Sequence, residues 1–254
     1  MTIGIVIMGL LVGTLVGLTG VGAASLLTPI LVLMGIHPSI AVGTDLVYNS
    51  VTKLFGFVQH ARQKTVNYPL VKYLAFGSIP GAAAAVVGLH VFSGWYHNEE
   101  QVIQYILGFV LMVAAVGTLI RVLFDSRLKV NHLQSKPLEE KVGLTIFIGV
   151  IFGFIVGLTS IGSGSLFALA MLYLYRLSGP EMVGTDIAHA FLLATVAGAL
   201  NAGLGHVNYT LVGNLLVGSI PGVVIGSALS TKVPSRPIRL VMSVLIFLSG
   251  LKLV

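Results

Sequence analysis

Two aspartates within long apolar stretches are the residues best placed for chemistry in this sequence. Asp45 and Asp186 each follow a Val-Gly-Thr triplet, and the other six acidic residues lie outside such stretches. An ionisable side chain inside a membrane is costly and is a functional candidate by default. We interpret both aspartates, with Thr44 and Thr185, as coupling or gating residues. In this interpretation the two aspartates carry the protons. The alternative is structural, because an aspartate beside a threonine can accept hydrogen bonds from a neighbouring turn and support it.

The two aspartates have different polar neighbours. Asn49 and Lys53 follow Asp45 at offsets of 4 and 8, which are positions on one face of a helix. The corresponding positions after Asp186 hold alanines, and His189 is the polar residue nearby. Lys53 either attracts an anion or extends its ammonium to the cytoplasmic interface. His189 is either a proton carrier or substrate ligand, or a packing residue.

Two glycine-rich motifs offer backbone rather than side-chain chemistry. Residues 17–26 return 140 positions later as 157–166. If the chain turns there and begins a new helix, backbone N–H groups lack intrahelical partners, and the partial positive charge of the helix start suits an anion. The alternative is that the glycines only allow close helix packing. The predicted substrate-binding residues of the motifs are Thr19, Gly20, Gly22, Ala23, Ser25, Thr159, Gly162, Ser163, Gly164 and Ser165, and they join Asn49, Lys53 and His189.

The duplication extends along the whole chain. After one inserted residue the offset becomes 141, and three further elements match in order: Val-Gly-Thr-Asp at 42–45 and 183–186, Val-Asn-Tyr at 66–68 and 207–209, and Ser-Ile-Pro-Gly at 78–81 and 219–222. In so apolar a chain, a repeat with glycine-rich breaks at corresponding positions is typical of a secondary transporter that binds its substrate between the halves. We predict a first repeat at 1–122, a cytoplasmic linker at 123–141 and a second repeat at 142–254.

The composition predicts an all-α integral membrane protein. Hydrophobic residues make up 56% of the chain and charged residues 9%, and the mean hydropathy is +1.01. The absence of cysteine excludes disulfides and thiolate metal sites. With scattered histidines and no paired acid–base motif, we predict no metal, no cofactor and no enzymatic activity. Apolar runs predict five segments in each repeat, at 3–18, 21–36, 40–59, 70–91 and 101–121, and at 142–158, 162–176, 182–202, 209–230 and 237–253.

The placement of basic residues predicts the orientation. The connections near 62–72, 121–141, 176 and 232–239 hold 12 of the 14 Lys and Arg residues, and they alternate with connections that hold none. Basic connections stay in the cytoplasm, so both termini are predicted outside. This placement explains the net charge of +6 without nucleic acid. Because five is odd, the second repeat enters the membrane inverted. The short segments beside each glycine-rich motif are either re-entrant hairpins or two short spans.

With these motifs the chain resembles, over its whole length, the sulfite exporter TauE/SafE family, also called the toluene-sulfonate uptake permease family. The motifs that carry the resemblance are Gly20-Val21-Gly22-Ala23-Ala24 and Ser160-Ile161-Gly162-Ser163-Gly164, each followed by an apolar helix and a Val-Gly-Thr element. The resemblance implies a prokaryotic inner-membrane transporter of small sulfur-containing anions such as sulfite, thiosulfate or organosulfonates.

We therefore predict a secondary transporter for such an anion, bound at glycine-rich helix N-termini near the membrane midplane between inverted repeats. The transporter lies in the lipid bilayer. Protons are the candidate coupling ion, and a homo-oligomer is the candidate assembly. Two alternatives stay open. One is a proton-coupled carrier of small carboxylates, and the other is a membrane assembly subunit that transports nothing.

Overall fold

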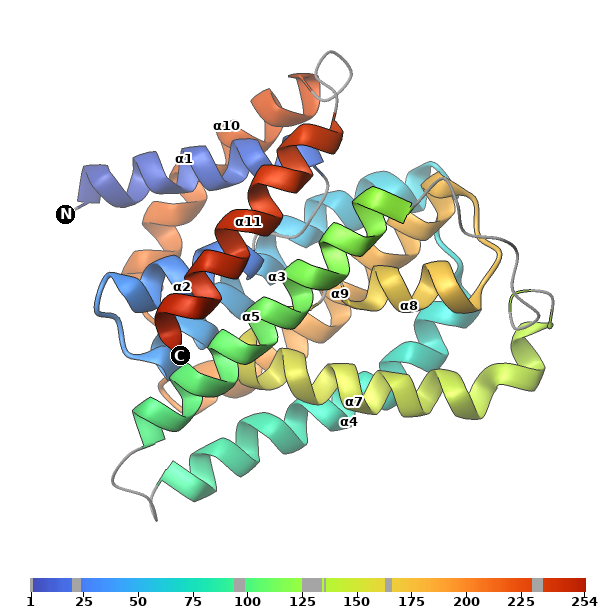
Figure 1. Ribbon diagram of the computed structural model, residues 1–254, viewed down its shortest axis with the longest axis horizontal. Helices are drawn as coiled ribbons and strands as arrows, with labels where there is room; N and C mark the ends of the chain where they lie inside the picture. Colours follow the sequence, from blue (N-terminus) through green and yellow to red (C-terminus); the bar gives the residue numbers. More distant parts are fainter. Residues whose placement is uncertain are drawn as a thin grey trace.

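The computed structural model is all-helical and describes residues 2–19, 24–93, 99–124, 134, 136–162, 166–229 and 235–254. In these residues each predicted apolar segment corresponds to one α-helix, so the all-α prediction is confirmed (Figure 1). The α-helices are α1 (Thr2–Thr19), α2 (Ala24–Leu33), α3 (Pro38–Arg62), α4 (Tyr68–Ser93), α5 (Glu99–Phe124), α7 (Val142–Thr159), α8 (Leu166–Leu174), α9 (Gly179–Gly203), α10 (Tyr209–Leu229) and α11 (Ser235–Leu253), with a short 3₁₀ turn at Leu138–Lys141.

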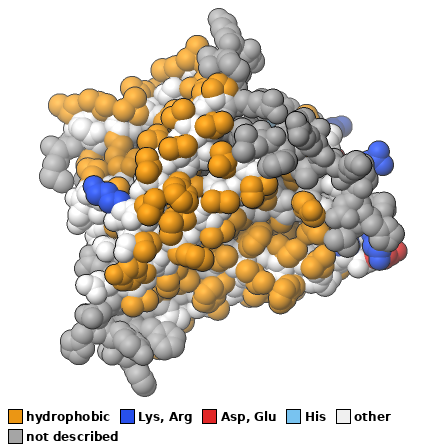
Figure 2. All heavy atoms as spheres, in the orientation of Figure 1, with side chains coloured by type: hydrophobic (Ala, Val, Ile, Leu, Met, Phe, Trp, Pro, Cys, Tyr) orange, Lys and Arg blue, Asp and Glu red, His pale blue; other side chains and the backbone are white. Residues whose placement is uncertain are grey.

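The outer surface is apolar, as a lipid-facing surface must be. Among the described residues, five stretches are long and apolar enough to cross a membrane: Tyr68–Val91, Gln101–Ile120, Leu138–Thr159, Gly179–Gly203 and Tyr209–Gly226. Large apolar side chains such as Phe76 and Phe109 are 68% and 64% exposed. In Figure 2 hydrophobic side chains are spread over the described part of this face, and its few charged side chains lie toward the two ends of the long axis. Lipid tails rather than water suit so large an apolar surface.

Two helices are too short to span a membrane. α2 has 10 residues and α8 has 9, which at 1.5 Å per residue is about 15 Å or less against a hydrocarbon core of about 30 Å. They are also shorter than the predicted segments 21–36 and 162–176. In the second half the backbone explains why α8 is shorter than the predicted segment. Ser160 and Gly162, which lie between α7 and α8, have φ of 60° and 114°, and such positive values interrupt a helix. α2 and α8 each begin inside the molecule, and Leu27 and Phe167 near their starts are fully buried.

Helices from the two halves of the chain pack against each other in equivalent pairs. α1 packs on α10 and α4 on α7, while α3 contacts α9 and α5 contacts α11. Small residues allow these close approaches. A methyl group on Gly149 of α7 would lie 2.7 Å from the Leu74 carbonyl oxygen of α4, and one on Gly9 of α1 would lie 2.5 Å from the Leu215 carbonyl oxygen of α10. These four residues match at the sequence offsets of 140 and 141, so both halves use the same packing device.

The directions of equivalent helices differ between the halves. In Figure 1, α1 runs from the N-terminus toward the opposite end of the molecule, and α7 runs back the other way. α5 and α11 also run in opposite directions across the front of the same view. α3 and α9 lie behind them, in the interior, and carry both of the buried aspartates. The polar residues predicted for the site therefore lie where helices from both halves meet.

Candidate functional site

Asp45 lies fully buried on α3 and is held by side chains from two helices. The Thr28 hydroxyl of α2 donates to its Oδ2 at 2.5 Å, and the Asn49 amide donates to its Oδ1 at 2.7 Å. The same amide donates to the Asp45 backbone carbonyl at 2.9 Å. These bonds fix the carboxylate and tie the short helix α2 to α3. They supply the supporting role that the structural alternative describes, and the coupling role stays a prediction.

The second glycine-rich motif reaches the same aspartate. The Ser160 hydroxyl is buried and lies beside the Asp45 carboxylate. Thr159, also fully buried, accepts a hydrogen bond from the Ile161 N–H at 3.2 Å and so holds the turn. Sequence reasoning named Thr159 and missed Ser160. The signal was present, because Ser160 corresponds to Gly20 at the offset of 140 and is the polar member of that pair.

Lys53 connects the two aspartates electrostatically. Asp186 lies on α9 and is 7% exposed, while Lys53 is half-buried on α3. The Asp186 carboxylate has the larger electrostatic effect on the Lys53 ammonium, and the Asp45 carboxylate has the smaller one. Packing of α3 against α9 brings the three together, since the rings of Phe57 and Phe191 stack there with centroids 5.5 Å apart. The structure thus joins three predicted site residues from different halves into one charged cluster.

His189 lies fully buried on α9, one helical turn after Asp186. Its Nε2 lies 2.8 Å from the Ser78 hydroxyl of α4, and its ring centroid lies 4.3 Å from that of Phe167 on α8. The Nδ1 atom has no hydrogen-bond partner among the described residues. A buried imidazole nitrogen without a partner is unusual and leaves one polar atom for a ligand or a water.

The other half repeats this arrangement with a tyrosine. Tyr48 corresponds to His189 at the offset of 141, and Ser219 corresponds to Ser78. Tyr48 is 1% exposed and lies near Ser219, whose buried hydroxyl has no hydrogen-bond partner among the described residues. Sequence reasoning missed Tyr48 and both serines. The repeated Ser-Ile-Pro-Gly element contained the serines, but their partners on α3 and α9 are distant in sequence, so only the fold shows the pairing.

Thr44 and Thr185 form equivalent clamps between the halves. The Asn208 N–H donates to the Thr44 Oγ1 at 3.0 Å, and the Asn67 N–H donates to the Thr185 Oγ1 at 3.0 Å. Each threonine is fully buried. Each bond holds the start of a helix, α10 or α4, against the helix that carries an aspartate. The predicted gating role of the two threonines stays a prediction.

Part of the predicted anion site lies outside the described residues. This applies to Gly20, Gly22, Ala23, Ser163, Gly164 and Ser165, and the side chains of Thr19 and Ser25 are not described either. Gly162 is described, and its carbonyl accepts the N–H groups of Leu166 and Phe167 at 3.1 and 3.3 Å. These two donors of α8 are therefore used within the chain. Among the described residues no group of three or more His, Asp or Glu could hold a metal ion.

Known proteins similar to this chain are probable membrane transporters. At 59% identity, covering 100% of both chains, this protein is similar to the probable membrane transporter protein YjnA of Bacillus subtilis. It is 26% identical to the probable membrane transporter protein YunE of the same organism, over 98% of this chain and 96% of that one. A probable membrane transporter protein of Methanocaldococcus jannaschii is 28% identical over 63% of this chain and 57% of that one. No solved structure matches.

The family profile of the sulfite exporter TauE/SafE matches residues 5–253. The chain belongs to this family of membrane transporters, which confirms the resemblance drawn from the glycine-rich motifs. It is a multi-pass membrane protein with bacterial relatives and a transporter rather than an enzyme.

Proposed function

We propose that the protein is a secondary transporter of small sulfur-containing anions, such as sulfite, thiosulfate or organosulfonates, in the cytoplasmic membrane. The observation that carries the proposal is the group formed by the buried Asp45, Asp186 and His189 with the half-buried Lys53, where α3 packs against α9. Charged groups inside a membrane protein mark substrate and ion pathways. This cluster lies where helices of the two halves meet, which is where transporters with repeats bind their substrates.

We propose that the two halves are inverted repeats and that α2 and α8 are re-entrant half-helices. Three observations support this arrangement: equivalent helices run in opposite directions in Figure 1, the inter-helix contacts occur in equivalent pairs, and α2 and α8 are too short to span. The N-terminal ends of such half-helices carry partial positive charge and suit an anion. The distribution of basic residues supports cytoplasmic connections near 62–72, 121–141, 176 and 232–239, with both termini outside.

The charges of the cluster favour transport of an anion together with a proton. With both aspartates ionised, Asp45, Lys53 and Asp186 carry a net charge of −1, which repels an anion. Protonation of one carboxylate removes this repulsion and leaves the Lys53 ammonium to attract the anion. The coupling ion is therefore a proton that binds to an aspartate when the substrate binds.

A panel of anions identifies the substrate class. Purified protein is heated with sulfite, thiosulfate, methanesulfonate, acetate or chloride, and the unfolding temperature is measured, because a ligand that binds only the folded state raises it. We expect stabilisation by one or more of the sulfur-containing anions and none by chloride. Stabilisation by acetate alone would favour the carboxylate carrier. No stabilisation by any anion, together with stable copurification of a second protein, would favour the assembly subunit.

A further inference from the structure

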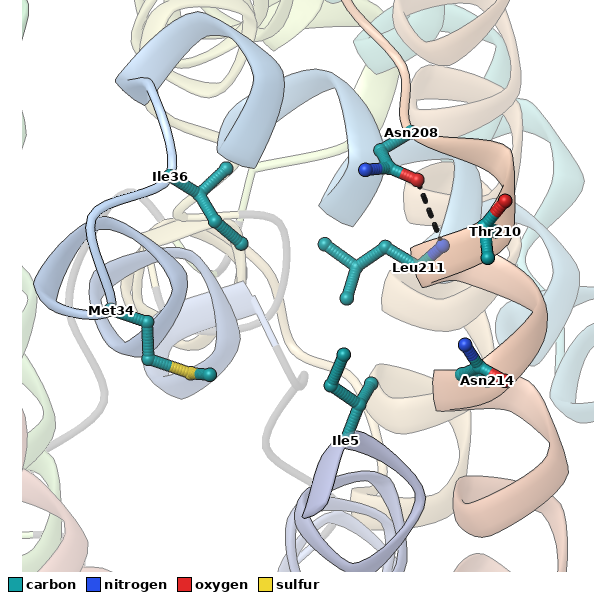
Figure 3. A pocket seen from close by; sticks show the side chains of 7 residues that line it. All are labelled: Ile5, Met34, Ile36, Asn208, Thr210, Leu211 and Asn214. Atoms are coloured by element: carbon teal, nitrogen blue, oxygen red, sulfur yellow. Dashed lines mark hydrogen bonds between the residues drawn. The ribbon is translucent and has the colours of Figure 1, made fainter. Parts of the chain in front are cut away.

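A surface pocket with a mainly apolar lining lies apart from the charged cluster, where α1 begins, α2 ends and α10 begins. Its volume is about 280 Å³, which holds a small anion with several waters at about 30 Å³ each. Figure 3 shows the side chains around it, with apolar ones from α1 and the end of α2 facing polar ones of α10. The lining residues are Ile5, Met34, Ile36, Asn208, Thr210, Leu211 and Asn214.

Asn208 presents a hydrogen-bond donor to this cavity. Its Oδ1 accepts the Leu211 N–H at 3.0 Å, which fixes the orientation of the amide because only the oxygen can accept. The amide nitrogen points away from that bond in Figure 3, into the space beside Ile36. Thr210 and Asn214 on the same helix add a hydroxyl and a second amide to the lining. The donors are neutral and the surrounding side chains are apolar.

The equivalent asparagine of the other half already holds an anionic group. Asn67 corresponds to Asn208, and its Oδ1 accepts the Leu70 N–H at 3.2 Å in the same way. Its amide nitrogen donates to the Glu181 carboxylate at 3.2 Å. Glu181 is the third residue of α9, and the residue that corresponds to it in α3 at the offset of 141 is Ile40. The first half therefore has the same amide donor but lacks the carboxylate that occupies it in the second half.

Side chains fill the place in the second half that corresponds to the cavity. Tyr175 directly follows α8 as Met34 directly follows α2, and Thr145 corresponds to Ile5 at the offset of 140. The Tyr175 hydroxyl is hydrogen-bonded to the Thr145 hydroxyl. The Lys141 ammonium donates to the Leu174 carbonyl at 2.8 Å and lies 4.7 Å from the centroid of the Tyr175 ring. One end of the molecule thus has a cavity where the other end has a closed, hydrogen-bonded cluster.

We propose that this cavity is the entry site for the transported oxyanion, which accepts a hydrogen bond from the Asn208 amide as the Glu181 carboxylate does from Asn67. Thr210 and Asn214 line the pocket on the other side of Leu211. The Asn208 backbone N–H is hydrogen-bonded to Thr44, the residue next to Asp45, so the start of α10 that carries the entry site contacts the helix that carries the charged cluster. This inference rests on the proposed function. It adds that the anion first binds at the end of the molecule where α1 and α10 begin.

Two substitutions of Asn208 test the site while keeping the helix start. Asp and Ser both accept the N–H bond that Asn accepts at this position. Asn208→Asp places a negative charge at the cavity, and Asn208→Ser removes the amide without adding charge. In right-side-out membrane vesicles we expect Asn208→Asp to raise the KM for uptake at least about tenfold and Asn208→Ser about threefold, the loss of one hydrogen bond or less. The maximal rate stays near that of the unchanged protein.

A chemical readout independent of transport uses the absence of native cysteine. Thr210→Cys is labelled with an impermeant maleimide, and we expect methanesulfonate to slow the labelling at concentrations near its KM. Vesicles of phosphatidylcholine and of phosphatidylglycerol separate a free anion from a lipid headgroup, because a headgroup bound in the cavity would slow labelling without added anion. An unchanged KM in both Asn208 variants, or protection by headgroups alone, overturns the entry site while wild-type uptake continues. Absence of wild-type uptake instead counts against the proposed function.

Discussion

Replacing Asp45 by asparagine separates a proton-coupling role from a supporting role. The carboxylate accepts one bond on each oxygen, from Thr28 on Oδ2 and from Asn49 on Oδ1. In Asp45→Asn, the new amide oxygen can still accept from Asn49, and the new NH₂ can donate to the Thr28 hydroxyl, which is able to accept. Both contacts therefore persist as neutral hydrogen bonds.

The expected cost in stability follows from these two bonds. A hydrogen bond to a charged group contributes about 1.5–3 kcal/mol and a neutral one about 0.5–1.5 kcal/mol. Two such exchanges cost about 2 kcal/mol, and the lower desolvation cost of a neutral amide offsets part of this. Asp45→Ala is the contrasting variant, because it leaves two buried donors without an acceptor at about 1–3 kcal/mol each. We expect Asp45→Asn to fold and Asp45→Ala to be clearly less stable.

The assay is anion flux in proteoliposomes with and without a pH gradient. We expect wild-type flux to be accelerated by the gradient, and Asp45→Asn to exchange anion without that acceleration, because an amide does not titrate. Asp186→Asn is the matched variant in the other half. Acceleration that persists in Asp45→Asn refutes the proton role of Asp45, and wild-type flux that ignores the gradient refutes coupling altogether. An Asp45→Asn protein as unstable as Asp45→Ala refutes the account of the hydrogen bonds.

Three further outcomes are expected. With both termini outside, a cysteine replacing the exposed Gly203 labels with an impermeant maleimide in intact cells and one replacing the exposed Gln63 does not; the opposite pattern would invert the orientation. Gly218→Leu destabilises folded protein in a thermal melt by about 1–3 kcal/mol, because a side chain there meets the backbone of α1, and a neutral effect would contradict the packing of α1 on α10. Ser78→Ala, which removes the partner of the buried His189 ring, lowers transport more than stability; loss of stability alone would make His189 a packing residue.

The sequence predicted the helices and the family better than it predicted contacts. Apolar run length and the Gly, Pro and charged residues between runs are local signals, so all ten segments could be located. Asp45 could be recognised as an intramembrane residue from a local signal too, because it lies within one apolar run. Its partners were not: Thr28 lies on another helix, and Ser160 lies in the other half of the chain. A pattern along one chain does not say which equivalent elements face each other.

Some differences between the two repeats can be interpreted only once the fold is known. The match between Asn67 and Asn208 was visible as a Val-Asn-Tyr element, yet its meaning depends on Glu181, which has no counterpart in the first half. The same applies to Tyr48 and His189, which occupy equivalent positions but have different side chains. Differences between repeats, rather than their common motifs, mark where the two sides of the protein differ in chemistry.

The most direct test of the central claim is uptake of radiolabelled sulfite and methanesulfonate by proteoliposomes that contain only this protein. The account predicts saturable uptake, competition between the two anions, and loss of uptake in a folded Lys53→Gln protein, because the ammonium beside both aspartates attracts the anion. Uptake equal to that of empty liposomes for every sulfur-containing anion, or full activity of Lys53→Gln, would contradict it.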